Sequence, residues 1–132
     1  MVFKGNPGTG KTLVASLVSK IYKEEGALSK GHTVSVCRND LVGVYVGETA
    51  IKTKAICQSA SGGVLFIDEV HALNESNDTY GMEALTTLIY EMEELKNDLC
   101  FIFAGYPKQV DEFLKANPGL QRRLNIVLDF DK

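Results

Sequence analysis

Short apolar runs alternate with amphipathic stretches along the whole chain. Five runs have the length and composition of strands and cover residues 2–3, 32–37, 64–67, 99–104 and 126–130. Four intervening segments have the character of helices and cover residues 12–25, 50–60, 80–96 and 108–115. Because strands that alternate with helices form βαβ units, the pattern predicts an α/β fold with a parallel sheet covered on both faces.

Two of these segments carry further information. The run 64–67 is continuously apolar and is followed by carboxylates, which predicts a strand buried on both faces at the centre of the sheet. The helix over 12–25 is predicted from two apolar rows at helical spacing, Leu13, Leu17 and Ile21 beside Val14, Val18 and Tyr22.

A glycine-rich segment lies between the first strand and the first helix. It consists of Gly5, Asn6, Pro7, Gly8, Thr9, Gly10, Lys11 and Thr12. Glycines let backbone N–H groups point at phosphate oxygens, and the following helix adds its positive dipole end. We expect Lys11 to reach the β- and γ-phosphates of ATP and the Thr12 hydroxyl to bind Mg²⁺. A plain glycine-rich turn would need neither side chain, so we predict an ATP site that also includes Leu13.

A second candidate group follows the run 64–67, where Asp68 and Glu69 are adjacent. Strand alternation is expected to point the two carboxylates in different directions. Asp68 can then orient the magnesium shell while Glu69 polarises the attacking water as a general base. A surface acidic pair is the better interpretation of these two residues alone, but the glycine-rich segment favours the catalytic one.

Composition and charge narrow the class of protein. The chain has 132 residues, 45% of them hydrophobic, which suits one domain. A net charge of −3 gives no electrostatic footprint for nucleic acid or an anionic membrane, so we expect neither partner. No apolar run reaches membrane-spanning length, and we expect a cytoplasmic protein. Three widely spaced cysteines, Cys37, Cys57 and Cys100, are expected to be reduced core thiols.

These motifs resemble the AAA+ ATPases, specifically the branch of stage V sporulation protein K and red-type Rubisco activase. The resemblance covers nearly the whole chain and is carried by GNPGTGKT at 5–12, LSKGHTVSVCRNDLVGVYVGETAIKTKAI at 28–56, GGVLFIDE at 62–69 and FIFAGYPKQVDEFLKANPGLQRRL at 101–124. It implies a three-layer αβα sandwich with a five-stranded parallel sheet in the order 5-1-4-3-2. It further implies ATP and Mg²⁺ as cofactors, a ring that is usually a hexamer, and action on protein substrates.

The resemblance also assigns residues outside the two motifs. Tyr45, Val46 and Gly47 match the pore loop, where an aromatic side chain grips an extended polypeptide. A packed core tyrosine is the alternative that the residues alone favour. Arg123 matches the arginine finger, which acts on nucleotide bound by a neighbouring subunit. The alternative for Arg123 and its neighbour Arg122 is a solvated basic end of a short helix or a salt-bridge partner.

The sequence departs from the family pattern at two positions and at its two ends. Tyr106 stands where many AAA+ proteins carry a polar sensor residue, and Leu124 replaces a phenylalanine that often follows the finger. Residues 1–132 are expected to be the large subdomain, truncated at its N-terminus and without the helical lid. We therefore predict ATP hydrolysis coupled to remodelling of protein substrates in a ring. The alternative is a truncated nucleotide-binding or assembly module with little turnover, and a P-loop protein acting on nucleic acid is disfavoured by the acidic charge.

Overall fold

The computed structural model describes residues 1–6, 9–45, 47–75 and 78–130. Its five strands form one sheet in the order β2-β3-β4-β1-β5, and every neighbouring pair is parallel. The strands are β1 (Val2–Lys4), β2 (Thr33–Val36), β3 (Val64–Ile67), β4 (Cys100–Gly105) and β5 (Val127–Asp129). Counted from the other edge, this order is the predicted 5-1-4-3-2, so the predicted sheet is confirmed. The middle position belongs to β4, however, and the prediction of β3 as the centre was wrong by one strand.

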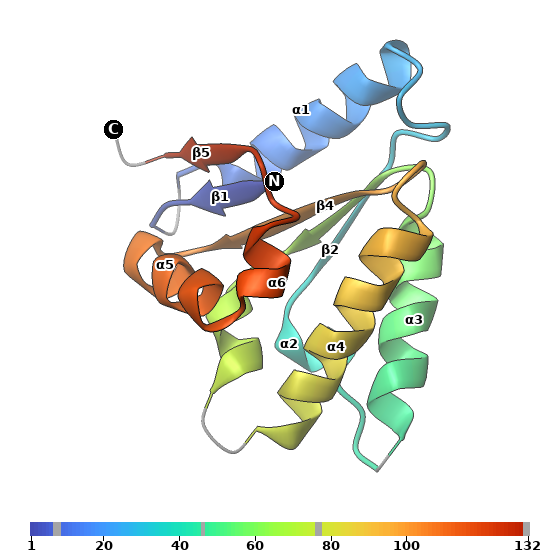
Figure 1. Ribbon diagram of the computed structural model, residues 1–132. Helices are drawn as coiled ribbons and strands as arrows, with labels where there is room; N and C mark the ends of the chain where they lie inside the picture. Colours follow the sequence, from blue (N-terminus) through green and yellow to red (C-terminus); the bar gives the residue numbers. More distant parts are fainter. Residues whose placement is uncertain (7–8, 46, 76–77, 131–132) are drawn as a thin grey trace.

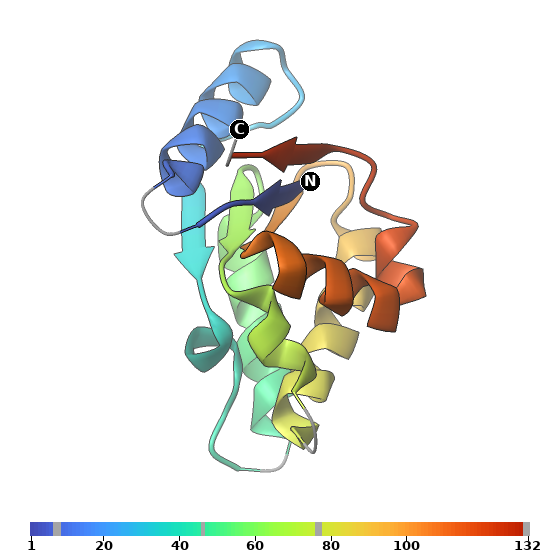
Figure 2. The ribbon, with the colours of Figure 1, turned by 90° about the vertical axis from the view of Figure 1, so that its left-hand side faces the viewer.

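Helices cover both faces of this sheet (Figure 1). They are α1 (Lys11–Glu24), α2 (Arg38–Leu41), α3 (Glu48–Ala60), α4 (Thr79–Glu94), α5 (Pro107–Ala116), α6 (Pro118–Gln121) and the 3₁₀ helix η1 (Val70–Asn74). Figure 2 shows α1 on one side of the sheet and the other long helices on the opposite side, which confirms the three-layer arrangement. None of the described helices is both long enough and apolar enough to cross a membrane.

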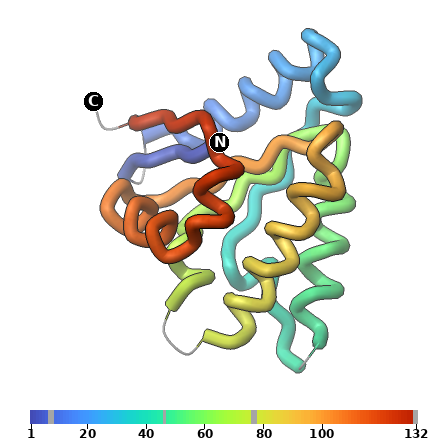
Figure 3. The backbone as a smooth tube through the Cα atoms, viewed as in Figure 1, coloured from blue at the N-terminus to red at the C-terminus, as the bar shows by residue number. Residues whose placement is uncertain are grey.

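The chain returns at its end to place β5 beside β1 (Figure 3). Val2 pairs with Val127 and Phe3 pairs with Leu128, so segments more than a hundred residues apart share one ladder. The edge strand β5 is exposed at all three positions. By contrast, all four residues of β3 are buried, as predicted for a strand covered on both faces.

Apolar side chains form one cluster on each face of the sheet, and Phe66 and Phe3 belong to the cluster on the α1 face. On the α1 face their rings meet edge-on, with centroids 6.2 Å apart. On the other face, Leu65 and Ile67 pack into the larger cluster under α3, α4 and α5. Burying apolar side chains of this size contributes about 1.5–3 kcal/mol each, so β3 is held from both sides.

The predicted boundaries of strands and helices agree with the structure to within two residues. The sequence patterns missed three short elements, α2, η1 and α6, each of only four or five residues. Elements of this length contain little more than one turn, so apolar spacing cannot reveal them.

The two apolar rows predicted on α1 have different surroundings. Val14, Val18 and Tyr22 pack against the core. Leu13 and Leu17, by contrast, are 67% and 47% exposed, and Ile21 is half exposed as well. Helical spacing therefore located the helix correctly but could not tell which row faces the sheet.

The three cysteines are free, but only one of them is a fully buried core thiol. Cys57 on α3 is completely buried, and burial raises the pKa of its thiol to about 12. Cys37 and Cys100 are half-buried, so the prediction of three core thiols holds fully for Cys57 alone.

Candidate functional site

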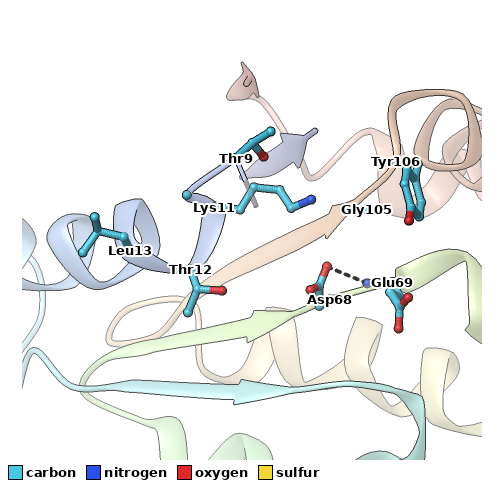
Figure 4. A pocket seen from close by; sticks show the side chains of 9 residues that line it. Thr9, Lys11, Thr12, Leu13, Asp68, Glu69, Gly105 and Tyr106 are labelled. Atoms are coloured by element: carbon cyan, nitrogen blue, oxygen red, sulfur yellow. Dashed lines mark hydrogen bonds between the residues drawn. The ribbon is translucent and has the colours of Figure 1, made fainter. Parts of the chain in front are cut away.

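A cavity of about 450 Å³ lies at the edge of the sheet where the parallel strands have their carboxyl ends (Figure 4). In open α/β sheets this edge is where ligands bind. The lining residues come from the start of α1, the end of β3 and the end of β4, and they are Thr9, Gly10, Lys11, Thr12, Leu13, Asp68, Glu69, Gly105 and Tyr106. The two motifs found in the sequence therefore meet in one place.

The segment before α1 is held by its own side chains. The Lys11 ammonium donates to the Gly5 carbonyl oxygen at 2.5 Å, and the Thr9 hydroxyl donates to the Asn6 carbonyl oxygen at 2.7 Å. The N–H of Gly5 donates to the carbonyl oxygen of Gly105 at 3.0 Å, which fixes the base of the segment to β4. Pro7 and Gly8, also predicted to bind nucleotide, lie outside the described residues.

Glycine is required at two points of this segment. Gly10 precedes α1 with φ 83°, a left-handed conformation that residues with a side chain rarely adopt. A Cβ on Gly5 would lie 2.7 Å from the Thr9 hydroxyl oxygen, closer than packing allows. Within the described part of the chain, no side chain caps the start of α1. This arrangement suits an anion at the helix start, with Lys11 beside it.

Asp68 and Glu69 diverge as predicted, but the cause is a backbone turn. Strand β3 ends at Ile67, and Glu69 adopts φ 51° and ψ 48°. It is the one non-glycine residue with positive φ among the described residues. The Glu69 N–H donates to Asp68 Oδ1 at 2.9 Å, and Figure 4 shows the two carboxylates pointing apart. Such a conformation costs about 1–3 kcal/mol and is concentrated at functional sites.

The residues predicted to hold a metal fit that role by their chemistry. In Figure 4 the Thr12 hydroxyl projects into the space between α1 and β3, where Asp68 also lies. Among the described residues no three His, Cys, Asp or Glu side chains are grouped for a metal. Mg²⁺ in phosphate sites does not need such a group, because one or two protein oxygens, waters and the phosphates complete its shell. Thr12 and Asp68 therefore fit a nucleotide-bound magnesium ion.

Three further residues complete the cavity wall. Tyr106 follows β4, is 36% exposed, and lies across the cavity from Lys11 (Figure 4). Leu13 borders the cavity, but its side chain points away from Asp68 and Glu69 (Figure 4). Gly105 was not predicted, although its place at the carboxyl end of a strand was a usable signal. A Cβ on Gly105 would lie at ordinary contact distance from the Glu69 Cα, 3.8 Å, but only 3.0 Å from Val110 Cγ2, so the tight neighbour of this glycine is the Val110 side chain.

Arg123 lies outside this cavity. Its guanidinium donates to the carbonyl oxygen of Gly119 at 2.8 Å, and the residue borders a different hollow with Glu93 and Lys96. Arg122 and Arg123 are both exposed. The structure thus does not bring Arg123 to the nucleotide cavity of its own chain, and the finger role remains a prediction.

Tyr45 is 73% exposed, so the alternative of a packed core tyrosine was wrong. It lies in the turn between α2 and α3, and its carbonyl oxygen accepts from the Glu48 N–H at 3.2 Å. Gly47, with φ 85°, precedes α3. Val46, the third residue of the predicted pore loop, lies outside the described residues.

Comparison with known proteins adds evidence on the family of this chain. Residues 1–132 match the AAA family, the ATPase family associated with various cellular activities. Stage V sporulation protein K of Bacillus subtilis (strain 168) is 48% identical over 131 residues, which cover 98% of this chain and 41% of that protein. Protein CfxQ of Xanthobacter flavus is 48% identical over 132 residues, covering 98% and 42%. The chain therefore spans about two-fifths of the length of these relatives.

Solved structures show the same fold. The crystal structure of the FIGL-1 AAA domain in complex with ADP aligns over 98% of this chain and 41% of its own, with a TM-score of 0.66 and 25% identity. A katanin structure aligns over 98% and 39%, with a TM-score of 0.60 and 22% identity. The sheet order, the position of the cavity and the family match over residues 1–132 all indicate the same family. This chain belongs to the AAA family of ATPases.

Proposed function

We propose that this chain binds Mg·ATP in the cavity at the carboxyl edge of the sheet and hydrolyses it. One observation carries the proposal: Lys11, Thr12, Asp68 and Glu69 come from two separate segments and line the same cavity. Family membership and the ADP complex of the FIGL-1 domain support nucleotide as the ligand. The bound magnesium ion would neutralise charge that develops between the β- and γ-phosphates.

The binding residues act on the phosphates. The Lys11 ammonium donates to the Gly5 and Asn6 carbonyl oxygens, at 2.5 and 3.4 Å, and is therefore already directed across the loop. When nucleotide binds, the ammonium exchanges these carbonyl partners for phosphate oxygens, whose charge makes the stronger hydrogen bond. The Thr12 hydroxyl and the Asp68 carboxylate supply the oxygens for the metal shell.

Glu69 is the proposed general base. Its left-handed backbone turns the carboxylate away from Asp68, so one carboxylate serves the metal shell and the other stays available to water. The carboxylate accepts a proton from the attacking water as the γ-phosphate is transferred. Side-chain exposure supports this role, since Glu69 is open to solvent at the cavity mouth.

Assembly and substrate handling form the second part of the proposal. We infer that chains assemble into a ring in which Arg123 of one chain reaches the nucleotide of the next, because Arg123 is exposed and lies outside its own cavity. The exposed Tyr45 would contact a protein substrate. Residues 1–132 would then correspond to the large, nucleotide-binding subdomain of such ring proteins.

A second candidate function is a nucleotide-binding module with little turnover. The observation that favours it is that no arginine is among the described residues lining the cavity, while Arg123 is held by the Gly119 carbonyl oxygen elsewhere. In this case Mg·ATP binds, but hydrolysis stays near the uncatalysed level at every protein concentration.

The test is steady-state ATP hydrolysis across a range of protein concentrations, run beside the Glu69→Gln variant and paired with sizing in nucleotide. The proposal expects turnover per chain that rises with concentration and disappears in Glu69→Gln. Binding without turnover in the assembled protein would support the module instead. Failure to bind Mg·ATP at all would contradict both functions.

A further inference from the structure

Arg38 and Asp78 form an ion pair with two hydrogen bonds, away from the nucleotide cavity. The Arg38 Nε donates to Asp78 Oδ2 at 2.7 Å, and an Arg38 Nη donates to Asp78 Oδ1 at 2.8 Å. The Asp78 side chain is only 13% exposed and that of Arg38 is 30% exposed. This two-point contact fixes the angle between the segments as well as their distance, because a guanidinium and a carboxylate are both planar.

Asp78 is fixed by a second contact. As the residue preceding α4, it accepts a hydrogen bond from the Gly81 N–H at 2.9 Å and caps the helix. Hydrogen bonding to Arg38 lowers the pKa of the Asp78 carboxyl, and the same bond raises the pKa of Arg38. Both groups therefore stay charged at neutral pH, and Arg38 is bound to the start of a long helix.

On the Arg38 side, the contact leads to Tyr45. Arg38 begins α2, and both the last residue of α2 and Gly43 beyond it are hydrogen-bonded to α3. The buried Thr53 hydroxyl donates to the Leu41 carbonyl oxygen at 2.9 Å, and the Gly43 N–H donates to the Thr49 hydroxyl at 2.9 Å. These bonds fix the base of the loop, while Tyr45, two residues beyond Gly43, is 73% exposed.

On the Asp78 side, the contact leads back to the nucleotide cavity. The 3₁₀ helix η1 starts at the residue after Glu69 and ends four residues before Asp78. It packs against α4, α5 and α2. We expect a displacement of the Glu69 turn to reach η1 and, through these contacts, the start of α4.

We propose that Arg38 and Asp78 are positioning residues that couple the nucleotide cavity to the Tyr45 loop. The inference deepens the proposed function, on which it rests, by naming the contact through which nucleotide state reaches the substrate-facing tyrosine. Movement at Glu69 passes through η1 to Asp78, across the ion pair to α2, and from α2 to Tyr45. The two-point geometry matters because a single flexible contact would let α2 and α4 move independently.

The chain has no tryptophan, so Tyr45→Trp places a single fluorescent reporter in the loop. In this background we compare Arg38→Met, which removes the charge, with Arg38→Lys, which keeps the charge but loses the planar two-point contact. The matched control is Asp98→Ala. Asp98 accepts from the Ser29 N–H and hydroxyl at 2.9 and 2.6 Å, and so joins two loops at the opposite, amino end of the sheet.

The first readout needs no nucleotide. Fluorescence anisotropy of the reporter tryptophan is expected to fall in Arg38→Met, to fall less in Arg38→Lys, and to stay at the parent value in Asp98→Ala. Circular dichroism and thermal unfolding identify variants that are unfolded rather than released. Folded Arg38→Met and Arg38→Lys proteins with parent anisotropy would overturn the inference, whatever the nucleotide experiments show.

The second readout compares the emission of the reporter tryptophan with Mg·ADP and with a non-hydrolysable Mg·ATP analogue, while calorimetry measures affinity separately. The parent and Asp98→Ala are expected to show different emission in the two states. In Arg38→Met this difference is expected to be about threefold smaller or more, at nearly unchanged nucleotide affinity. An undiminished difference in Arg38→Met would overturn the inference. Loss of nucleotide binding in the parent would instead contradict the proposed function, which the affinity measurement detects on its own.

Discussion

Strands β3 and β5 differ in burial, and each lies near a residue with a predicted catalytic role. All four residues of β3 are buried between helical layers, whereas all three residues of β5 are exposed at the edge of the sheet. Each strand adjoins charged residues with a predicted catalytic role. Glu69 lies two residues after the end of β3, and Arg123 precedes β5.

The difference distinguishes a site that one chain forms by itself from a site that would need residues of two chains. Because β3 is held on both faces, it positions Asp68 and Glu69 in the cavity that the start of α1 also lines, and a single chain forms this cavity. Arg123, close to an exposed edge strand, donates to the Gly119 carbonyl oxygen of its own short helix and stays exposed. Under the proposed function, nucleotide binding is therefore a property of the single chain, whereas turnover requires the assembly.

Replacing the arginine should have the largest effect. Arg123→Ala is expected to lower kcat by a factor on the order of 10³–10⁵ in assembled protein, since in the proposed ring the guanidinium would stabilise charge on the transferred phosphoryl group. Mg·ATP affinity should stay close to that of the parent. The adjacent Arg122→Ala serves as the control and should lose far less activity. Equal losses in the two variants would remove the special role of Arg123.

Glu69→Gln tests the carboxylate that follows β3. The amide cannot accept a proton from water, so hydrolysis should fall by a factor on the order of 10²–10⁴ while nucleotide still binds. Steady-state turnover and equilibrium binding are measured on the same preparation. Glu24→Gln, an exposed acid at the far end of α1, should hydrolyse like the parent. Full activity in Glu69→Gln would show that another group activates the water.

Truncating one side chain in each strand compares how much burial contributes to the free energy of unfolding. Phe66→Ala in β3 should lower the free energy of unfolding by about 3–5 kcal/mol, because it opens a cavity in a fully buried site. Leu128→Ala in β5 removes a side chain that is 37% exposed and should cost about 1 kcal/mol or less. Denaturant unfolding of both variants gives the two values. A cost at Leu128 as large as at Phe66 would show that the β5 edge is packed in solution.

The smallest expected effect concerns acid stability at the start of α4. Arg38 lowers the pKa of Asp78 in the folded state, so the pair stabilises the fold above the usual aspartate pKa. That contribution is lost as the pH falls through the lowered pKa. Asp78→Asn should therefore be less stable than the parent at neutral pH, with the gap narrowing toward low pH. A gap that is constant over the acid range would mean that the carboxylate charge contributes nothing.

Much of the fold could be predicted because its patterns are periodic. The run 64–67 is apolar at every position and became a fully buried strand, and the helices longer than two turns were found to within two residues. The failures have physical causes. Helical spacing gives the position of α1 but not which of its two apolar rows faces the sheet, and the row with Leu13 and Leu17 is exposed.

The candidate site was predictable where its residues adjoin in sequence. Lys11 with Thr12, and Asp68 with Glu69, were identified from local motifs. The left-handed turn at Glu69 could not be predicted, because glutamate has no intrinsic preference for this conformation. The contact between Arg38 and Asp78 was likewise hidden, since forty residues separate them and only the tertiary fold brings them together.

The most direct test of the central claim mixes two inactive variants. Glu69→Gln chains keep Arg123, and Arg123→Ala chains keep an intact nucleotide cavity. If the arginine acts across chains, a mixture contains boundaries where an intact cavity meets an intact arginine, and ATP hydrolysis should recover well above that of either variant alone. A mixture no more active than its components, although sizing shows that they assemble together, would contradict the claim that turnover requires Arg123 from a neighbouring chain.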